Sequence, residues 1–130
     1  MREAIELARE GMKDGLGGPF GAVIVKQGEV VGRGANRVVR AMDPTAHAEI
    51  VAIRDACARL GTHVLAGCDA YATCEPCPMC LAALYWARVD RVLFASTRSD
   101  ARRAGFDDER LWDELVLASG DRQMPAIRIE

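Results

Sequence analysis

The chain has 130 residues, a formal net charge of −2, and a composition in which half of the residues are hydrophobic. This length suits one domain that buries a core without disulfide bonds, and we expect residues 1–130 to form it. Apolar runs are too short to span a bilayer, and the charged segment 1–14 does not resemble a signal peptide. We therefore expect no membrane partner and a cytoplasmic location. The acidic balance argues against a nucleic acid partner, which a basic surface would bind through its phosphates.

The first half of the chain predicts a helix, a β-hairpin and a second helix. Gln27-Gly28 favours a tight turn between two strands, and Gly32 and Gly34 are expected to weaken or bulge the second strand. A loop-like stretch then closes with Asp43 and Thr45, either of which can cap the helix that follows. That helix is expected to stop at a glycine. The predicted ranges are a helix at 2–14, strands at 20–25 and near 30–31, a loop at 35–44, and a helix at 46–60 before Gly61.

The second half predicts strands that alternate with helices. Residues 91–95 are apolar on both faces, which is typical of a central strand. Arg98, Arg102 and Arg103 lie among acidic residues and are expected on a solvated or salt-bridged surface. The pattern predicts an α/β fold, a three-layer α/β/α sandwich with a mixed, roughly five-stranded sheet. The predicted ranges are strands at 69–73, 91–95 and 126–129, with helices at about 77–87 and 108–115.

Two separated motifs carry the chemistry: His47-Ala48-Glu49 and Pro76-Cys77-Pro78-Met79-Cys80. Two thiolates and one imidazole suit zinc, and a catalytic zinc has three protein ligands with one position kept for water. H-x-E followed by P-C-x-x-C is the signature of zinc-dependent nucleobase deaminases. Glu49 lies close enough in sequence to move a proton from that water to the substrate. The motifs therefore predict a Zn²⁺ site at His47, Cys77 and Cys80, with Glu49 as the catalytic acid and base.

Other readings of the five cysteines explain less. An odd count with three cysteines clustered favours metal ligation over a disulfide framework. Cys74, Cys77 and Cys80 resemble part of an iron–sulfur motif, but no fourth cysteine follows at the required spacing. Cys74 as a fourth zinc ligand is the alternative to its expected place as a small buried side chain. A redox pair leaves the histidine and glutamate unexplained, and a non-catalytic zinc-stabilised binding module leaves Glu49 without a role. Cys57 and Cys68 are expected in the core, and Glu75 in a solvated loop.

These segments resemble the cytidine deaminase-like superfamily and, within it, bacterial guanine deaminases. The likeness covers nearly the whole chain. The resemblance implies a zinc-dependent aminohydrolase of purine metabolism that converts guanine to xanthine and ammonia. Alternatives within the superfamily are deamination of cytosine, of a related aminated heterocycle or of adenosine in tRNA. The matching segments are residues 17–26, 43–49, 73–80, 85–88 and 104–108.

The resemblance also implies roles for single residues. Asn36 matches an asparagine that hydrogen-bonds the purine, Phe20 an aromatic that stacks on the base, and Asp108 an aspartate that recognises the guanine edge. Ala48, inside the first motif, is assigned to the same substrate site. Asn36 and Asp108 lie in loop-like stretches, where turn formation is the alternative role.

The family likeness further implies a homodimer, in which Trp86 packs on its helix or contacts the second subunit. Guanine deaminases of this type continue into a C-terminal helix and tail that swaps between subunits and helps close the partner's active site. This sequence ends at Glu130 and leaves the swap and the closure of the pocket undecided.

Overall fold

The sheet begins with a hairpin whose turn is set by two residues with positive φ. Gln27 has a φ of 50° and Gly28 a φ of 81°, which is the geometry of a two-residue type I′ turn. The turn joins β1 (Gly21–Lys26) to β2 (Glu29–Ala35), and the register slips between Ile24 and Val25. Ile24 pairs with Gly32 while Val25 pairs with Val30, so β2 carries a bulge, as the glycines predicted.

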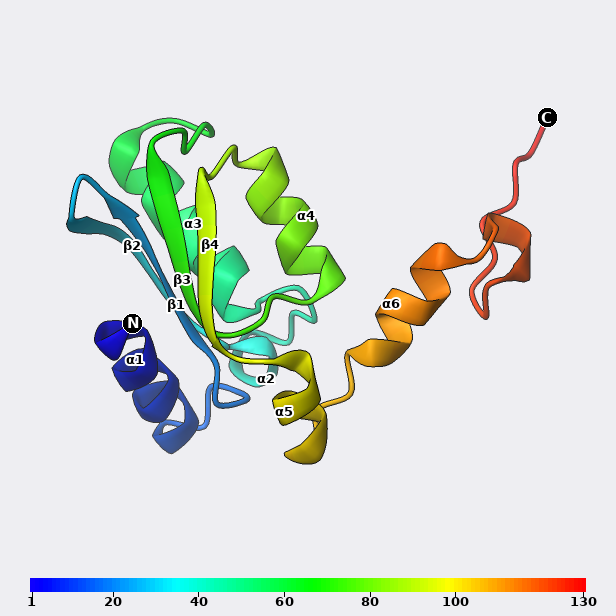
Figure 1. Cartoon of the computed structure of the whole chain (residues 1–130), viewed down its shortest axis with the longest axis horizontal. Helices are drawn as coiled ribbons and strands as arrows, with labels where there is room; N and C mark the ends of the chain where they lie inside the picture. Colours follow the sequence, from blue (N-terminus) through cyan, green and yellow to red (C-terminus); the bar gives the residue numbers. More distant parts are fainter.

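A mixed four-stranded sheet in the order β2-β1-β3-β4 forms the centre of the computed structural model, which describes residues 1–130 (Figure 1). Only the β3–β4 pair is parallel. Helices α3 and α4 lie on one face of the sheet, and α1 lies on the other (Figure 1). The remaining elements are α1 (Arg2–Lys13), α2 (Val38–Ala41), α3 (Ala48–Leu60), β3 (Cys68–Cys74), α4 (Pro78–Trp86), β4 (Arg91–Ser96), α5 (Arg98–Arg103), α6 (Glu109–Val116) and the 3-10 turn η1 (Ser119–Asp121).

Close packing between β2 and α3 explains the glycines of the second strand. A Cβ atom at Gly34 would lie 2.1 Å from the Ala48 carbonyl oxygen, and one at Gly32 would lie 2.5 Å from the Ala52 carbonyl oxygen. Ala48, Ala52 and Ala56 recur every four residues, so they share one face of α3. The small residues on both elements let the helix backbone rest against the strand, which fixes the position of the N-terminus of α3.

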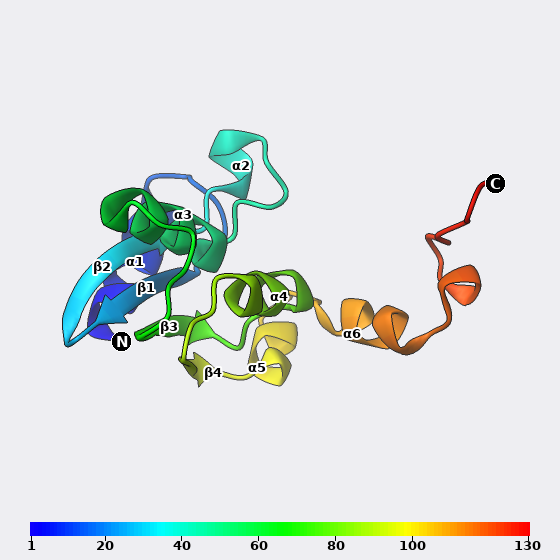
Figure 2. The same cartoon turned by 90° about the horizontal axis from the view of Figure 1, so that it is seen from above.

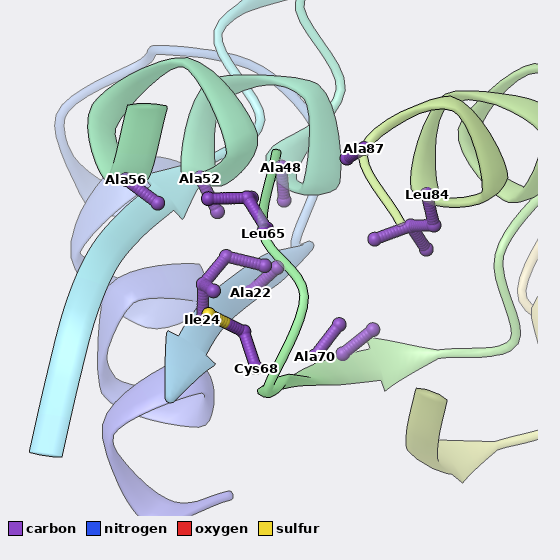
Figure 3. Close-up of a cluster of buried hydrophobic side chains, with 11 residues drawn as sticks. Ala22, Ile24, Ala48, Ala52, Ala56, Leu65, Cys68, Ala70, Leu84 and Ala87 are labelled. Carbon is purple, nitrogen blue, oxygen red and sulfur yellow. The ribbon is translucent and has the colours of Figure 1, made fainter. Parts of the chain in front are cut away.

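The main hydrophobic core lies between the sheet and the helices α3 and α4. Its eleven buried residues include Ile24 and Cys68 from the strands and Leu84 from α4 (Figure 3). Leu65, from the connection between α3 and β3, fills the space between helix and sheet and is fully buried. Since α3 and α4 share this core, their N-termini are held at a set distance from each other.

Two expectations about the strands are wrong. Residues 126–129 form no strand, so the sheet has four strands, although the predicted α/β sandwich class is confirmed. Residues 91–95 belong to β4, which lies at an edge and pairs only with β3. Phe94 is 45% exposed. An apolar run signals a strand, but the number of its neighbours depends on segments distant in sequence.

Helix boundaries differ from the prediction at one informative place. Helix α3 begins at Ala48 with His47 as its N-cap, two residues later than expected. Thr45 donates two hydrogen bonds to Asp43, from its backbone N–H at 2.8 Å and from its hydroxyl at 2.7 Å. The two predicted capping residues therefore bond to each other, and the cap position is left to the histidine. The short helices α2 and α5 were not predicted, because four and six residues show too little periodicity.

The chain beyond α5 leaves the sandwich. Helix α6 and the residues after it extend away from the sheet in both views (Figures 1 and 2). Helix α6 was predicted close to its observed bounds. The basic cluster before it is a salt-bridged surface, as predicted: Arg102 pairs with Glu109, and Arg103 with Asp100. None of the helices combines the length and the apolar character that crossing a membrane requires.

Candidate active site

Two helix N-termini converge on the predicted metal ligands. His47 is the N-cap of α3 and Cys77 the N-cap of α4, and both have an extended backbone, with ψ of 157° and 167°. Neither side chain caps its own helix. Cys80 follows one turn after Cys77, on the same face of α4. The three side chains are therefore free to face one another from two different elements.

The ligand atoms have the separations that zinc requires. His47 Nδ1 lies 3.6 Å from Cys77 Sγ and 3.5 Å from Cys80 Sγ, and all three atoms lie within 4.8 Å of one another. A tetrahedral zinc with bonds of about 2.3 Å to sulfur and 2.0 Å to nitrogen would hold these atoms about 3.6 Å apart. The cluster therefore fits zinc and supplies three ligands, which is the number that leaves one position open.

The two thiols act as a pair. Hydrogen bonds from Cys80 and from the His47 ring lower the pKa of the Cys77 thiol. Hydrogen bonding to Cys77, together with burial, raises the pKa of the Cys80 thiol. One of the two sulfurs is thus readily a thiolate, the form that binds metal, and the positive ends of two helices favour that charge.

Glu49 lies in the first turn of α3, beside the cluster. Its side chain is buried, with only 9% of the residue exposed, and burial raises the pKa of its carboxyl group. Glu49 lines the same cavity as His47 and Cys77. A buried carboxyl group next to a metal cluster and open to a cavity is suited to exchange protons with a ligand there.

The cavity beside the cluster measures about 240 Å³. Phe20 and Phe106 form one wall as an edge-to-face pair, with ring centroids 4.9 Å apart and an interplanar angle of 78°. This volume is below the range of about 300–1,000 Å³ that is usual for drug-sized ligands. The cavity therefore suits a small ring compound.

Asn36 is a buried polar residue on the cavity wall. Its Oδ1 accepts a hydrogen bond of 3.2 Å from the Val38 N–H, which leaves the carboxamide NH₂ group available to a ligand. Gly17 makes room for this side chain, because a Cβ atom there would lie 2.1 Å from Asn36 Oδ1. The glycines that precede Phe20 thus have a role in shaping the site.

Asp108 lines the cavity from the segment between α5 and α6. It is half-buried, and burial followed by the charge of Cys77 raises the pKa of its carboxyl group. The site therefore offers a donor group from Asn36 and a carboxylate from Asp108. Ala48 does not line the cavity, and its methyl group packs in the hydrophobic core.

Several cavity residues were not predicted from the sequence. Glu75, expected in solvent, is half-buried on the cavity wall, and its Oε2 accepts a 3.0 Å hydrogen bond from the Arg98 N–H. Phe106 lies two residues before Asp108, inside a segment that the family likeness had marked, and its aromatic character was the available signal. Cys74 is buried as expected, and it reaches the cavity wall as well.

A sandwich that carries an open metal cluster with a buried carboxylate beside it is the architecture of zinc-dependent hydrolytic deaminases. Residues 1–96 match the family described as the cytidine and deoxycytidylate deaminase zinc-binding region. The chain belongs to this family, which confirms the resemblance inferred from its motifs. It is accordingly a zinc-dependent aminohydrolase.

Similar proteins include two guanine deaminases and a tRNA deaminase. The guanine deaminase of Bacillus subtilis is 48% identical over 129 residues, which cover 99% of this chain and 83% of that protein. Its X-ray structure superposes with a TM-score of 0.96 over 99% of this chain and 82% of that one. The guanine deaminase of Nitrosomonas europaea is 35% identical, with a TM-score of 0.76 over 81% of this chain and 61% of that one. The tRNA-specific adenosine deaminase of Aquifex aeolicus is 50% identical over 78 residues, or 60% of this chain and 52% of that protein.

Metal content tests the cluster directly. Because three ligands close all but one position, the purified protein should contain about one zinc per chain. Cys77→Ala should lose both zinc and thermal stability, because two ligands hold the ion poorly and metal binding contributes to folding. Cys74→Ala is the matched control, since it removes a neighbouring buried thiol outside the cluster and should keep the zinc. Elemental analysis that finds iron, or no metal after gentle purification, would contradict the assignment.

Proposed function

We propose that the protein converts guanine to xanthine and ammonia. The observation that carries this proposal is the similarity to the guanine deaminase of Bacillus subtilis, which spans 99% of this chain at 48% identity. A cavity of about 240 Å³, with a donor and a carboxylate on its walls, is consistent with a free base as substrate. The proposed reaction belongs to purine metabolism.

The proposed metal ligands are His47, Cys77 and Cys80, whose three atoms lie within 4.8 Å of one another. Zinc bound there would lower the pKa of a coordinated water toward neutrality and so supply the nucleophile. The chain's contribution is to present the reacting carbon of the base to this position. The wall formed by Phe20 and Phe106 restricts where a flat ring can lie.

Glu49 is the proposed proton carrier. Its carboxylate would take one proton from the attacking water and give it to a ring nitrogen. It would then take a second proton from the hydroxyl group now bound to the carbon and give it to the amino group that leaves as ammonia. The buried side chain lines the cavity beside His47, which supports a role in proton transfer to a base held there. Burial also limits competition from bulk water for the same proton.

Asn36 and Asp108 are the proposed groups that select guanine. Guanine presents acceptors at O6 and N7 and a donor at its N2 amino group. The Asn36 NH₂ group suits an acceptor, and the Asp108 carboxylate suits N–H donors, while Phe20 provides a face for stacking. The backbone of Ala48 is the remaining proposed contact from the sequence, since its side chain lies in the core.

Deamination of adenosine in tRNA is the second candidate. It is favoured by the 50% identity to the tRNA-specific adenosine deaminase of Aquifex aeolicus. That similarity spans 60% of this chain, whereas the similarity to the Bacillus subtilis guanine deaminase spans 99%. The net charge of −2 also favours a small uncharged substrate over a polyanion.

We further propose that the protein is a cytoplasmic homodimer. Its five cysteines are all free thiols, which suits a reducing compartment. Tyr85 and Trp86 on α4 are 74% and 80% exposed, so Trp86 does not pack on its own helix, and aromatic residues of this kind are enriched at interfaces.

Light scattering at micromolar concentration should report a dimer, and Trp86→Ala should increase the fraction of monomer, because it removes an exposed aromatic anchor. A wild-type protein that is monomeric at this concentration would contradict the dimer.

Glu49→Gln separates a catalytic role from a ligand role. The variant keeps the shape of the side chain but cannot act as an acid or a base, so turnover should fall by at least roughly a hundredfold while zinc stays bound. Ammonia release and elemental analysis measure the two effects. Loss of zinc in this variant would mean that Glu49 is a metal ligand and that the proposed role is wrong.

Asp108→Ala tests the choice of base. Wild-type protein should deaminate guanine well above cytosine and adenine. The variant should lose most of that difference, about 1–3 kcal/mol or roughly 5- to 150-fold, because the N–H donors of guanine are left unpaired. Zinc should remain bound.

Asp107→Ala is the matched control for this experiment, since it removes the adjacent, exposed carboxylate and should leave the preference unchanged. A wild-type enzyme that prefers cytosine or adenosine and leaves guanine intact would defeat the guanine proposal.

A further inference from the structure

A second cavity of about 190 Å³ lies next to the catalytic one. Phe20, Cys74 and Phe106 line both cavities, so these three side chains form the partition between them. Behind the partition, Thr73 and Asp100 add polar groups to a space that the proposed reaction does not use. The partition therefore limits the room that a ligand has on that side of the cavity.

Local backbone chemistry fixes the position of Phe106. Helix α5 ends in a Schellman motif, in which the Phe106 N–H donates to the Ala101 carbonyl at 3.0 Å and the Gly105 N–H to the Arg102 carbonyl at 2.9 Å. Gly105 has a φ of 93°, a conformation that residues with a side chain rarely adopt. The motif turns the chain at the end of α5 and leaves the aromatic ring against Phe20.

The other end of α5 is fixed as well. Thr97 and Asp100 form a capping box, with the Asp100 N–H donating to Thr97 Oγ1 at 3.2 Å and the Thr97 N–H to Asp100 Oδ2 at 2.8 Å. The Arg98 N–H donates to Glu75 Oε2 at 3.0 Å, which ties the helix to the loop that carries Cys77. The ring of Phe106 is thus part of a braced element.

The aromatic pair packs against the backbone of Gly18. A Cβ atom at Gly18 would lie 3.0 Å from Phe20 Cε2 and 3.5 Å from Phe106 Cε1, so the backbone of Gly18 backs directly onto both rings. The Phe20 carbonyl oxygen accepts a 2.9 Å hydrogen bond from the Asn36 N–H. Phe20 is therefore tied to the residue proposed to bind the base, and Phe106 lines both cavities from the turn that follows α5.

We propose that Phe106 is a specificity-determining residue that limits the substrate to unsubstituted bases. Its ring separates the second cavity from the first, so a base held beside the metal cluster finds no space for an alkyl group on the side that faces Phe106. Removing the ring joins the two cavities and admits alkylated bases. This inference rests on the proposed deamination for its reaction, but the size limit is a property of the partition.

The experiment compares Phe106→Ala and Phe106→Leu with wild type on guanine and on its 1-, 7-, 8- and 9-methyl derivatives. For each, kcat/KM is measured relative to guanine. Phe106→Ala should raise the relative value for at least one methylguanine by at least roughly tenfold, because one methyl or methylene group is worth that much in a hydrophobic pocket. The relative kcat/KM of Phe106→Leu should lie between those of wild type and Phe106→Ala, because leucine keeps apolar bulk without the ring. Phe94→Ala, on the edge strand β4 and away from both cavities, is the matched control and should match wild type.

Unchanged ratios for all four methylguanines in both variants would overturn the proposal. Zinc content and melting temperature identify a variant that fails to fold, and Phe106→Leu then decides the question. Binding by calorimetry tests the size limit without turnover: wild type that binds every methylguanine within threefold of guanine would also overturn it. If wild type deaminates another base and leaves guanine intact, the proposed substrate fails, and the same ratios are measured with that base and its methyl derivatives.

Discussion

The close approach of α3 to the sheet is the constraint on which the site depends. Gly32 and Gly34 leave no side chain between β2 and the helix, and the alanines of α3 face them. Because His47 and Glu49 stand at the start of this helix, any outward shift of α3 would move both away from the cysteines of α4. Ligand separations of 3.5 and 3.6 Å leave little tolerance for such a shift. The geometry of the candidate site is therefore set by backbone packing some distance along the helix.

At both helix starts, the residue that would normally cap the helix faces the metal cluster. Serine, threonine, asparagine and aspartate stabilise helix N-termini by about 1 kcal/mol through a side-chain hydrogen bond, and neither His47 nor Cys77 makes one. A metal bound to both residues would join the two helix starts. It would thereby offset the stabilisation that the missing side-chain caps do not provide. The same helix ends carry partial positive charge, which favours thiolate ligands and a carboxylate beside them. The same few residues therefore affect both the stability of the two helix starts and the chemistry of the candidate site.

The proposed metal ligands and the residues proposed to set the size limit and contact the base beyond α5 lie in different parts of the chain. The proposed ligands and Glu49 lie within residues 1–96, the part that matches the deaminase family. Phe106 and Asp108 lie beyond it, on the segment between α5 and α6. A metal-activated water attacks any suitable carbon that is placed near it, so discrimination between bases falls to the walls of the cavity. In the proposed reaction, the segment between α5 and α6 supplies both a size limit, through Phe106, and a polar contact, through Asp108.

Features that depend on near neighbours in sequence were determined by the sequence alone. The turn at Gln27 and Gly28 is one, because two residues set its geometry. The pairing of Cys77 with Cys80 on one helical face is another, because helical periodicity alone places them together.

Other features required the tertiary structure. Four features depend on which distant segments pack together. They are the edge position of β4, the absence of a fifth strand, the place of His47 as a helix cap, and the ring of Phe106 in the cavity wall. Sequence patterns report which face of an element is apolar. They do not report which element covers that face, since burial is decided by contacts between residues far apart in the chain.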